Sequence, residues 1–250
     1  MTIPFVFLFL AWQQPTELDQ VLGKVQENIA QFEASLPDFV CNERITSSRL
    51  AGDRVSQQVV NEAVFASSPS RDPLSEQKSR EVREMISIDG RKVDKDSEPK
   101  GPFILIGGFS GAAAAIFDKR IEPYRNYRRE PEERGLLVIA FETKKGQTGI
   151  GAYTGSRKFL AKDSGKAWID PKTMQVVRLE TLVVNGPTKL PYWLTQVDFA
   201  EVQIDGRPFW MPVTVRSSLR KKPNLAPERT FLAEYSNYRK FDVSTGIIFH

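Results

Sequence analysis

Hydrophobic residues near the start of the chain recur at helical spacing. Between residues 16 and 36 apolar side chains return every three or four positions, and most positions between them are polar or charged. This spacing predicts one amphipathic helix. Thr16 followed by Asp19 matches a capping box, and Pro37 predicts that the helix ends near Ser35. A helix with a single apolar face must pack on another layer of structure.

From Phe39 onward the pattern changes to the alternation typical of strands. The runs 39–50 and 54–66 flank Gly52-Asp53 and predict a hairpin, and Asp89-Gly90, Asp170-Pro171 and Asp205-Gly206 mark further tight turns. Residues 136–143 are apolar at successive positions, which predicts a strand covered on both faces. About nine or ten strands at hairpin spacing predict an antiparallel meander.

We therefore predict an α+β fold in which a curved antiparallel meander sheet, a half-barrel, packs on the N-terminal amphipathic helix and a short internal helix. The internal helix is expected at residues 111–117, where glycines and alanines follow an apolar run, with Ser110 as its N-cap and Gly107-Gly108 permitting the turn. No linker rich in Pro, Gly or Ser divides the chain. Residues 15–250 are thus expected to form a single β-rich domain.

An unbroken apolar run at residues 3–12 precedes the helix and is followed at once by polar residues. The run is too short to span a bilayer as a helix but has the length of a signal-peptide core. No basic residue stands between Met1 and the run, and no small-x-small cleavage site follows it. We predict that residues 1–14 are a signal peptide, that the mature chain has no transmembrane span, and that it is periplasmic or secreted; a buried first strand is the alternative.

Composition and charge are those of an ordinary folded protein. Hydrophobic residues make up 40% and charged residues 26% of the chain, and the net charge is +4. Basic clusters at Arg125, Arg128 and Arg129 and at residues 220–222 are interpreted as solvated surface, with weak attraction to anionic envelope lipid or polysaccharide as the alternative. Because no nucleic-acid motif accompanies them, no nucleic-acid partner is expected.

Ser110 is the one candidate nucleophile. The run Gly108-Phe109-Ser110-Gly111-Ala112 approximates a nucleophile elbow, but a serine hydrolase also needs a base, and the sole histidine, His250, is the last residue. Alanines stand where a phosphate loop needs Lys and Ser or Thr. A hydrolase that uses Ser110 or a pair of carboxylates therefore stays only as an alternative.

Metal and redox chemistry are not indicated. One histidine and one cysteine do not supply the usual ligands for zinc, copper or iron, and no Asp-rich calcium loop is present. The run Glu130, Glu132, Glu133 is interpreted as a solvated turn, and Cys41 as a packed thiol. We expect no cofactor and no enzymatic activity.

Aromatic residues on the predicted strands are the feature that points to a ligand. If the sheet curves, some of them would line its concave side and form an apolar groove; core packing is the other interpretation. The candidate ligand-binding residues are Trp168, Trp193, Phe199 and Trp210.

With a leader, one N-terminal amphipathic helix and a long antiparallel meander, the chain resembles the LolA-type superfamily of outer-membrane lipoprotein carriers and related periplasmic sensors. The segments that carry the resemblance are GKAWIDPKTMQVVRLE, VDFAEVQIDGRPFWMPVTV and YSNYRKF, within residues 16–242. The resemblance implies a half-barrel that shelters acyl chains in an apolar cavity without covalent chemistry.

Our leading hypothesis is accordingly an exported, non-catalytic binding protein for an apolar ligand such as a lipid or a lipoprotein acyl chain. An envelope protein that serves as an interaction or scaffold module, with a filled core and an envelope protein as its partner, is the first alternative. The hydrolase is the second.

Overall fold

A computed structural model describes residues 16–69, 79–105, 109–147, 151–154, 157–160, 162–184 and 192–241. The predicted signal peptide at 1–14, the glycine pair at 107–108 and His250 lie outside the described residues. No helix in the ranges just given is long and apolar enough to cross a membrane.

The N-terminal helix α1 (Glu17–Ser35) has the ends that the sequence predicts. The Thr16 hydroxyl accepts a hydrogen bond from the backbone N–H of Asp19 at 3.2 Å, and the Asp19 carboxylate accepts one from the backbone N–H of Thr16 at 2.9 Å. This capping box satisfies two N–H groups at the helix start. Val21, Leu22, Val25 and Ile29 form the apolar stripe of α1 and are buried in one core cluster with residues of the strands.

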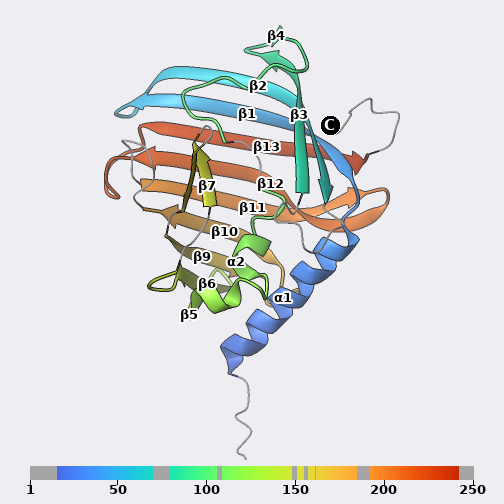
Figure 1. Cartoon of the computed structure of the whole chain (residues 1–250), viewed down its shortest axis with the longest axis vertical. Coiled ribbons are helices and arrows are strands. Elements are labelled where there is room, and N and C mark those ends of the chain that lie inside the picture. The colour runs from blue at the N-terminus through green and yellow to red at the C-terminus, as the bar shows by residue number, and fades with distance from the viewer. Residues whose placement is uncertain are drawn as a thin grey trace, which may run out of the picture.

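Eleven of the described strands form one open antiparallel sheet, shown in Figure 1. Its order is β4-β3-β2-β1-β13-β12-β11-β10-β9-β6-β5, so two meanders are joined where the first strand pairs with the last. A separate hairpin is formed by β7 (Gly151–Thr154) and β8 (Arg157–Leu160). The predicted α+β fold with a curved antiparallel sheet is confirmed. The strands of the large sheet are β1 (Phe39–Ala51), β2 (Arg54–Pro69), β3 (Ser79–Ile88), β4 (Arg91–Lys92), β5 (Arg125–Glu133), β6 (Leu136–Thr143), β9 (Asp163–Ile169), β10 (Val176–Val183), β11 (Tyr192–Ile204), β12 (Arg207–Arg220) and β13 (Arg229–Lys240).

The predicted hairpin turns are present because their residues tolerate left-handed backbone. Asp89 and Gly90 have φ of 49° and 73°, and Asp205 and Gly206 have φ of 53° and 71°. Positive φ at both central residues is the signature of the two-residue turn that matches the twist of a hairpin. These turns fix the register of β3 on β4 and of β11 on β12.

The core lies on the concave side of the sheet, where one contiguous cluster of buried apolar side chains joins the strands to α1 and to the short helix α2 (Ala114–Phe117). In Figure 1, α1 runs obliquely past the lower strands and α2 lies in front of β9 and β10. Ile116 and Phe117 of α2 are almost fully buried. The helices and the loop before α2 therefore cover the lower half of the sheet.

The predicted cap of α2 is wrong. The helix begins at Ala114 with Ala113 at its N-cap and no side-chain cap, while residues 110–113 form turns that precede it. The Ser110 hydroxyl instead donates to Oε1 of Glu81 on β3 at 3.0 Å. A partner on a distant strand thus competes successfully with the local backbone for this hydroxyl.

The segment after α2 also differs from the prediction. A 3-10 helix, η1 (Glu122–Tyr124), leads into β5, and Glu130, Glu132 and Glu133 lie in that edge strand rather than in a solvated turn. An edge strand has one unpaired side, so it tolerates charges and Pro131. Arg125 does not lie on a solvated face as predicted, because it is 5% exposed and paired with Asp163.

Candidate functional site

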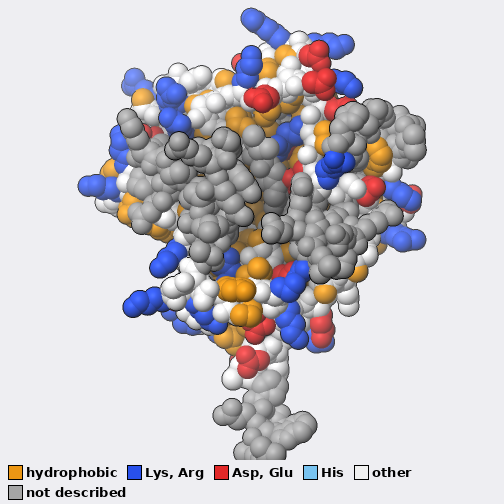
Figure 2. Space-filling model, viewed as in Figure 1, with side chains coloured by type: hydrophobic (Ala, Val, Ile, Leu, Met, Phe, Trp, Pro, Cys, Tyr) orange, Lys and Arg blue, Asp and Glu red, His pale blue; other side chains and the backbone are white. Residues whose placement is uncertain are grey.

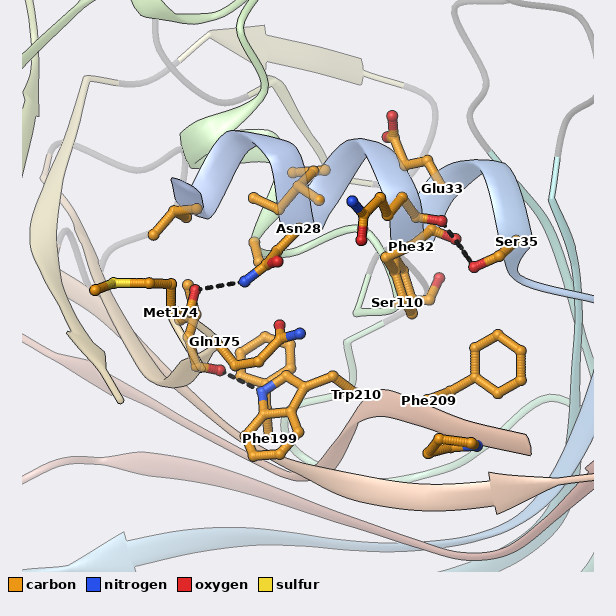
Figure 3. A pocket seen from close by; sticks show the side chains of 18 residues that line it. Asn28, Phe32, Glu33, Ser35, Ser110, Met174, Gln175, Phe199, Phe209 and Trp210 are labelled. Carbon is orange, nitrogen blue, oxygen red and sulfur yellow. Dashed lines mark hydrogen bonds between the residues drawn. The ribbon is translucent and has the colours of Figure 1, made fainter. Parts of the chain in front are cut away.

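A cavity of about 210 Å³ opens between α1 and the concave face of the sheet (Figure 3). Four parts of the chain enclose it: the second half of α1, the turn before α2, the turn after β9, and strands β11 and β12. Apolar residues provide most of its lining, and polar residues with one glycine provide the rest. The apolar residues are Val25, Ile29, Phe32, Ala113, Ala114, Met174, Val176, Phe199, Pro208, Phe209 and Trp210; the others are Asn28, Gln31, Glu33, Ser35, Ser110, Gly111 and Gln175.

Three aromatic residues of the β11–β12 pair form the floor. A register shift between Asp198 and Phe199 marks a bulge, which bends the paired strands at the cavity. Below α1 in Figure 3, Phe199 and Trp210 lie together and Phe209 lies to one side. The indole N–H of Trp210 donates to the carbonyl of Val176 at 2.7 Å, so the ring is held in place while its polar atom is satisfied.

Helix α1 forms the roof and is tied to the sheet by one amide. The Asn28 side chain donates to the carbonyl oxygens of Thr173 and Met174, both at 2.9 Å. Met174 has a φ of 56°, and in Figure 3 its carbonyl faces Asn28. The turn between β9 and β10 thus fixes the height of α1 above the floor.

Polar residues at the rim of the cavity include Ser110 in the turn before α2 and Glu33 on α1. Ser110 is held by Glu81, and Glu33 lies 3.5 Å from the Arg120 guanidinium. Gln31 and Ser35 bond to each other along α1, where the serine hydroxyl donates to the Gln31 carbonyl at 2.7 Å. The lining therefore combines apolar side chains with a substantial share of polar groups, a mixture that suits an amphipathic small molecule.

Beside the cavity, α2 is fixed by a buried polar anchor. Arg125 pairs with Asp163 at 2.8 Å and donates to the Ala115 carbonyl at 3.4 Å, and the Tyr127 hydroxyl donates to the Ile116 carbonyl at 2.5 Å. Burial raises the pKa of Tyr127 to about 12, so this hydroxyl stays protonated and remains a donor at neutral pH. The α2 side of the cavity is therefore rigidly supported.

At the other end of the concave face a second buried ion pair joins Arg83 of β3 to Glu43 of β1. A guanidinium N–H donates to the Glu43 carboxylate at 2.9 Å, and the Arg83 guanidinium lies 5.4 Å from the centre of the Phe65 ring. Burial opposes the charge of Arg83, but the hydrogen bonds and charge of Glu43 outweigh it and raise the pKa of the arginine. The carboxylate is thus already paired within the fold.

Cys41 is fully buried, as the sequence predicts. Burial and the nearby charge of Glu43 raise the pKa of its thiol well above the ordinary value. The thiol is therefore protonated at neutral pH and lacks the thiolate character of a nucleophile.

The structure brings together two of the four predicted ligand-binding residues. Phe199 and Trp210 line the cavity. Trp193 packs on the core away from it, edge-on to Phe103, with its N–H donating to the Ser217 hydroxyl at 2.6 Å. Trp168 lies on the opposite face of the sheet from its buried neighbours in β9, where its N–H donates to Glu133 at 2.9 Å.

Helix α1 and the β9–β10 turn contribute to the cavity, and neither contribution was predicted from the sequence. Asn28 carried a usable signal, because it stands among apolar residues at the spacing of the buried stripe, close to Val25 and Phe32. A polar residue on a buried stripe needs a partner, and Asn28 finds two carbonyls. Met174 and Gln175 gave no comparable signal because they follow a turn.

The Ser110 hydroxyl donates a hydrogen bond to the carboxylate of Glu81. Its hydrogen-bond partner is therefore not the histidine that a serine hydrolase uses as a base, and His250 lies outside the described residues. Within the described ranges, no group of three or more His, Cys, Asp or Glu residues is placed to hold a metal ion. The arrangement can bind a molecule, and it presents no assembled set of catalytic groups among these residues.

Comparison with known proteins gives similarities of fold alone. No model of a known protein family matches the sequence. No curated protein matches it significantly. The structure is similar to the LolA superfamily protein NE2245 from Nitrosomonas europaea, with a TM-score of 0.45 and 13% identity over 92% of this chain and 97% of that chain. It is also similar to a DUF1329 family protein from Desulfovibrio piger, with a TM-score of 0.40 and 12% identity over 92% of this chain and 95% of that chain. The first of these two structures is from the LolA superfamily, the group that the sequence pattern resembles.

Proposed function

We propose that this protein is an exported, non-catalytic binding protein that holds the apolar part of a small amphipathic ligand between α1 and the β11–β12 pair. The observation that carries the proposal is the cavity of about 210 Å³ with an aromatic floor and a polar rim. Burial of an apolar ligand there would be favourable by about 25 cal/mol for each Å² of apolar surface removed from water.

The size of the cavity limits the ligand. It exceeds the roughly 150 Å³ of an apolar cavity that accepts benzene, and it is below the roughly 300–1,000 Å³ of pockets for drug-sized molecules. A short alkyl chain or one end of an acyl chain suits this space. A complete long acyl chain requires α1 to move away from the sheet.

Export is part of the proposal and rests on the apolar run at residues 3–12. We place the mature protein in the periplasm or outside the cell, with a lipid or lipoprotein as the source of the alkyl chain. The alternative of a scaffold with a filled core is less well supported, because it gives no reason for an aromatic-floored space beneath α1.

Gly111 provides a direct test. A Cβ built on this glycine meets no atom within 4 Å, its φ lies outside the left-handed region, and the residue lines the cavity. Gly111→Leu should therefore fill the space without a clash at its Cβ and abolish binding of decanol, measured by calorimetric titration of the purified protein. Gly23→Leu is the matched control, because Gly23 also has open space at its Cβ but lies on α1 outside the cavity lining.

The proposal predicts that wild type and Gly23→Leu bind decanol alike and that Gly111→Leu does not. Absence of binding to every member of an alcohol series from hexanol to hexadecanol would contradict it. Equal binding by Gly111→Leu and wild type would place the ligand elsewhere and contradict the assignment of this cavity.

A further inference from the structure

One end of the large sheet concentrates positive charge. We call it the basic end and define it as residues 49–55, which contain the β1–β2 turn, and residues 220–229, which contain the β12–β13 loop. The two segments are neighbours, because Arg49 lies opposite Arg229 and the backbone N–H of Leu50 donates to the Glu228 carbonyl at 2.9 Å. In Figure 1 both turns lie at the left end of the sheet.

The basic end has six basic and two acidic residues, a net charge of +4 that equals the net charge of the whole chain. Figure 2 shows Lys and Arg side chains along the left rim of the molecule, where this end lies. The basic residues are Arg49, Arg54, Arg220, Lys221, Lys222 and Arg229.

Most of this charge is not neutralised within the fold. Arg49 and Arg229 lie directly opposite each other on neighbouring strands, an arrangement that like charges disfavour. Lys221 forms an ion pair with Glu228 at 2.6 Å, whereas Arg54 and Lys222 have no carboxylate partner among the described residues. Both are exposed, so their charges are available to an external anion.

Exposed aliphatic side chains accompany the charge. Val55 is 55% exposed and Leu225 is 45% exposed, and they are two of the four large hydrophobic residues that the described part of the chain exposes. Basic groups attract an anionic lipid surface, and aliphatic groups beside them can enter the boundary between headgroups and acyl chains. Basic side chains next to exposed aliphatic side chains suit the surface of a lipid bilayer better than a polyanion such as a nucleic acid or a polysaccharide.

We propose that the basic end docks on the surface of a membrane that contains anionic phospholipid. The lysine and arginine side chains would contact the headgroups while Val55 and Leu225 enter the interface. Docking of this kind is peripheral and reversible, because a few charges and two side chains supply the attraction. The proposal holds whether or not the cavity binds an alkyl chain.

Co-sedimentation with vesicles tests it. The full chain should sediment with vesicles of phosphatidylcholine and phosphatidylglycerol, should not sediment with phosphatidylcholine alone, and should be released by high salt. The double variant Arg54→Glu, Lys222→Glu removes two exposed and unpaired cations and should lower the partition coefficient by more than about tenfold. Leu225→Ser should lower it by a smaller factor.

The matched control is the double variant Arg91→Glu, Lys92→Glu. These two adjacent cations are exposed on β4, at the top of Figure 1, and their reversal changes the net charge by the same amount. The control should keep most of the binding. Equal loss in both double variants, no sedimentation with anionic vesicles, or retention by heparin or DNA without vesicle binding would each overturn the proposal. Circular dichroism of each variant confirms that the fold is retained.

Discussion

Ile116 of α2 and Ile29 of α1 are the same residue type on the same side of the sheet, and their surroundings differ. Ile116 is 1% exposed and sits beside Phe117, whose ring stacks on Tyr127 at 5.7 Å. Ile29 is 9% exposed and borders the cavity. Helical periodicity in the sequence predicts that Ile29 faces the core, and both side chains are buried in the structure, but Ile116 completes a closely packed layer whereas Ile29 forms part of the cavity wall.

This contrast shows where the fold obtains stability and where it has room for a ligand. In the α2 region, aromatic rings, an ion pair and two hydrogen bonds to backbone carbonyls fix the segment. In the cavity region, the side chain of Asn28 is the one polar tie between α1 and the β9–β10 turn that the described residues show. We expect changes in the first region to affect folding and changes in the second to affect binding.

Removal of the buried anchor should give the largest effect. Asp163→Ala leaves the Arg125 charge buried without its partner, so it should lower the free energy of unfolding by about 3–5 kcal/mol. Urea denaturation measures the loss. Asp198→Ala is the control, because Asp198 pairs with Arg178 and Arg216 on a more exposed surface and should cost no more than about 1 kcal/mol. Similar costs for both variants would contradict a special role for the anchor.

The two isoleucines can then be compared directly. Ile116→Ala should lower the free energy of unfolding by about 3–4 kcal/mol, and Ile29→Ala by about 2 kcal/mol, because Ile29 already borders empty space and loses fewer packing partners. The same denaturation experiment gives both values. If Ile29→Ala costs as much as Ile116→Ala, the space beneath α1 is filled in solution and the comparison fails.

Removal of the hydrogen bonds between Asn28 of α1 and the β9–β10 turn should affect ligand binding more than stability. Asn28→Ala removes hydrogen bonds to two carbonyls and should lower the free energy of unfolding by about 1 kcal/mol. Because the roof then moves more freely, bound decanol should dissociate faster, as measured by stopped-flow tryptophan fluorescence, to which Trp210 on the cavity floor contributes. Unchanged dissociation with reduced stability would show that Asn28 acts in folding alone.

The smallest effect concerns pH. Burial alone would raise the pKa of Asp198, but hydrogen bonds from Arg178 and Gln196 and the charges of Arg178 and Arg216 hold it below its ordinary value of 3.8. A carboxyl whose pKa is lowered by folding contributes stability above its ordinary pKa and loses it as the pH falls through the folded value. Unfolding free energy measured from neutral to acidic pH should therefore fall more steeply in wild type than in Asp198→Asn. If the unfolding free energies of wild type and Asp198→Asn fall in parallel with pH, the lowered pKa of Asp198 is contradicted.

Much of the fold could be predicted because its signals are local. The capping box of α1 lies within four consecutive residues, and the turns at Asp89-Gly90 and Asp205-Gly206 need only two. Arg125 could not be placed, because its burial depends on Asp163, 38 residues away. Strand β5 was missed because an edge strand with Pro131 and several charges has the composition of a loop.

The candidate site was harder to predict than the fold. The aromatic floor could be anticipated through Phe199 and Trp210, since both lie on predicted strands. The roof could not, because whether α1 touches the floor depends on the combined shapes of four separate segments. Alternation in β9 also places Trp168 away from Ala167 and Ile169, which are buried in the core, so an aromatic residue on a strand does not by itself indicate a ligand.

The central claim is that an alkyl chain occupies the space beneath α1 and leaves the α2 region unchanged. Methyl NMR spectra of the protein, recorded during titration with decanol, test this most directly. We predict progressive, saturable shifts of the Ile29 and Met174 methyl signals, which come from the cavity wall, with little change at Ile116. Shifts at Ile116 and Ile29 alike, or no shift at either, would contradict the account.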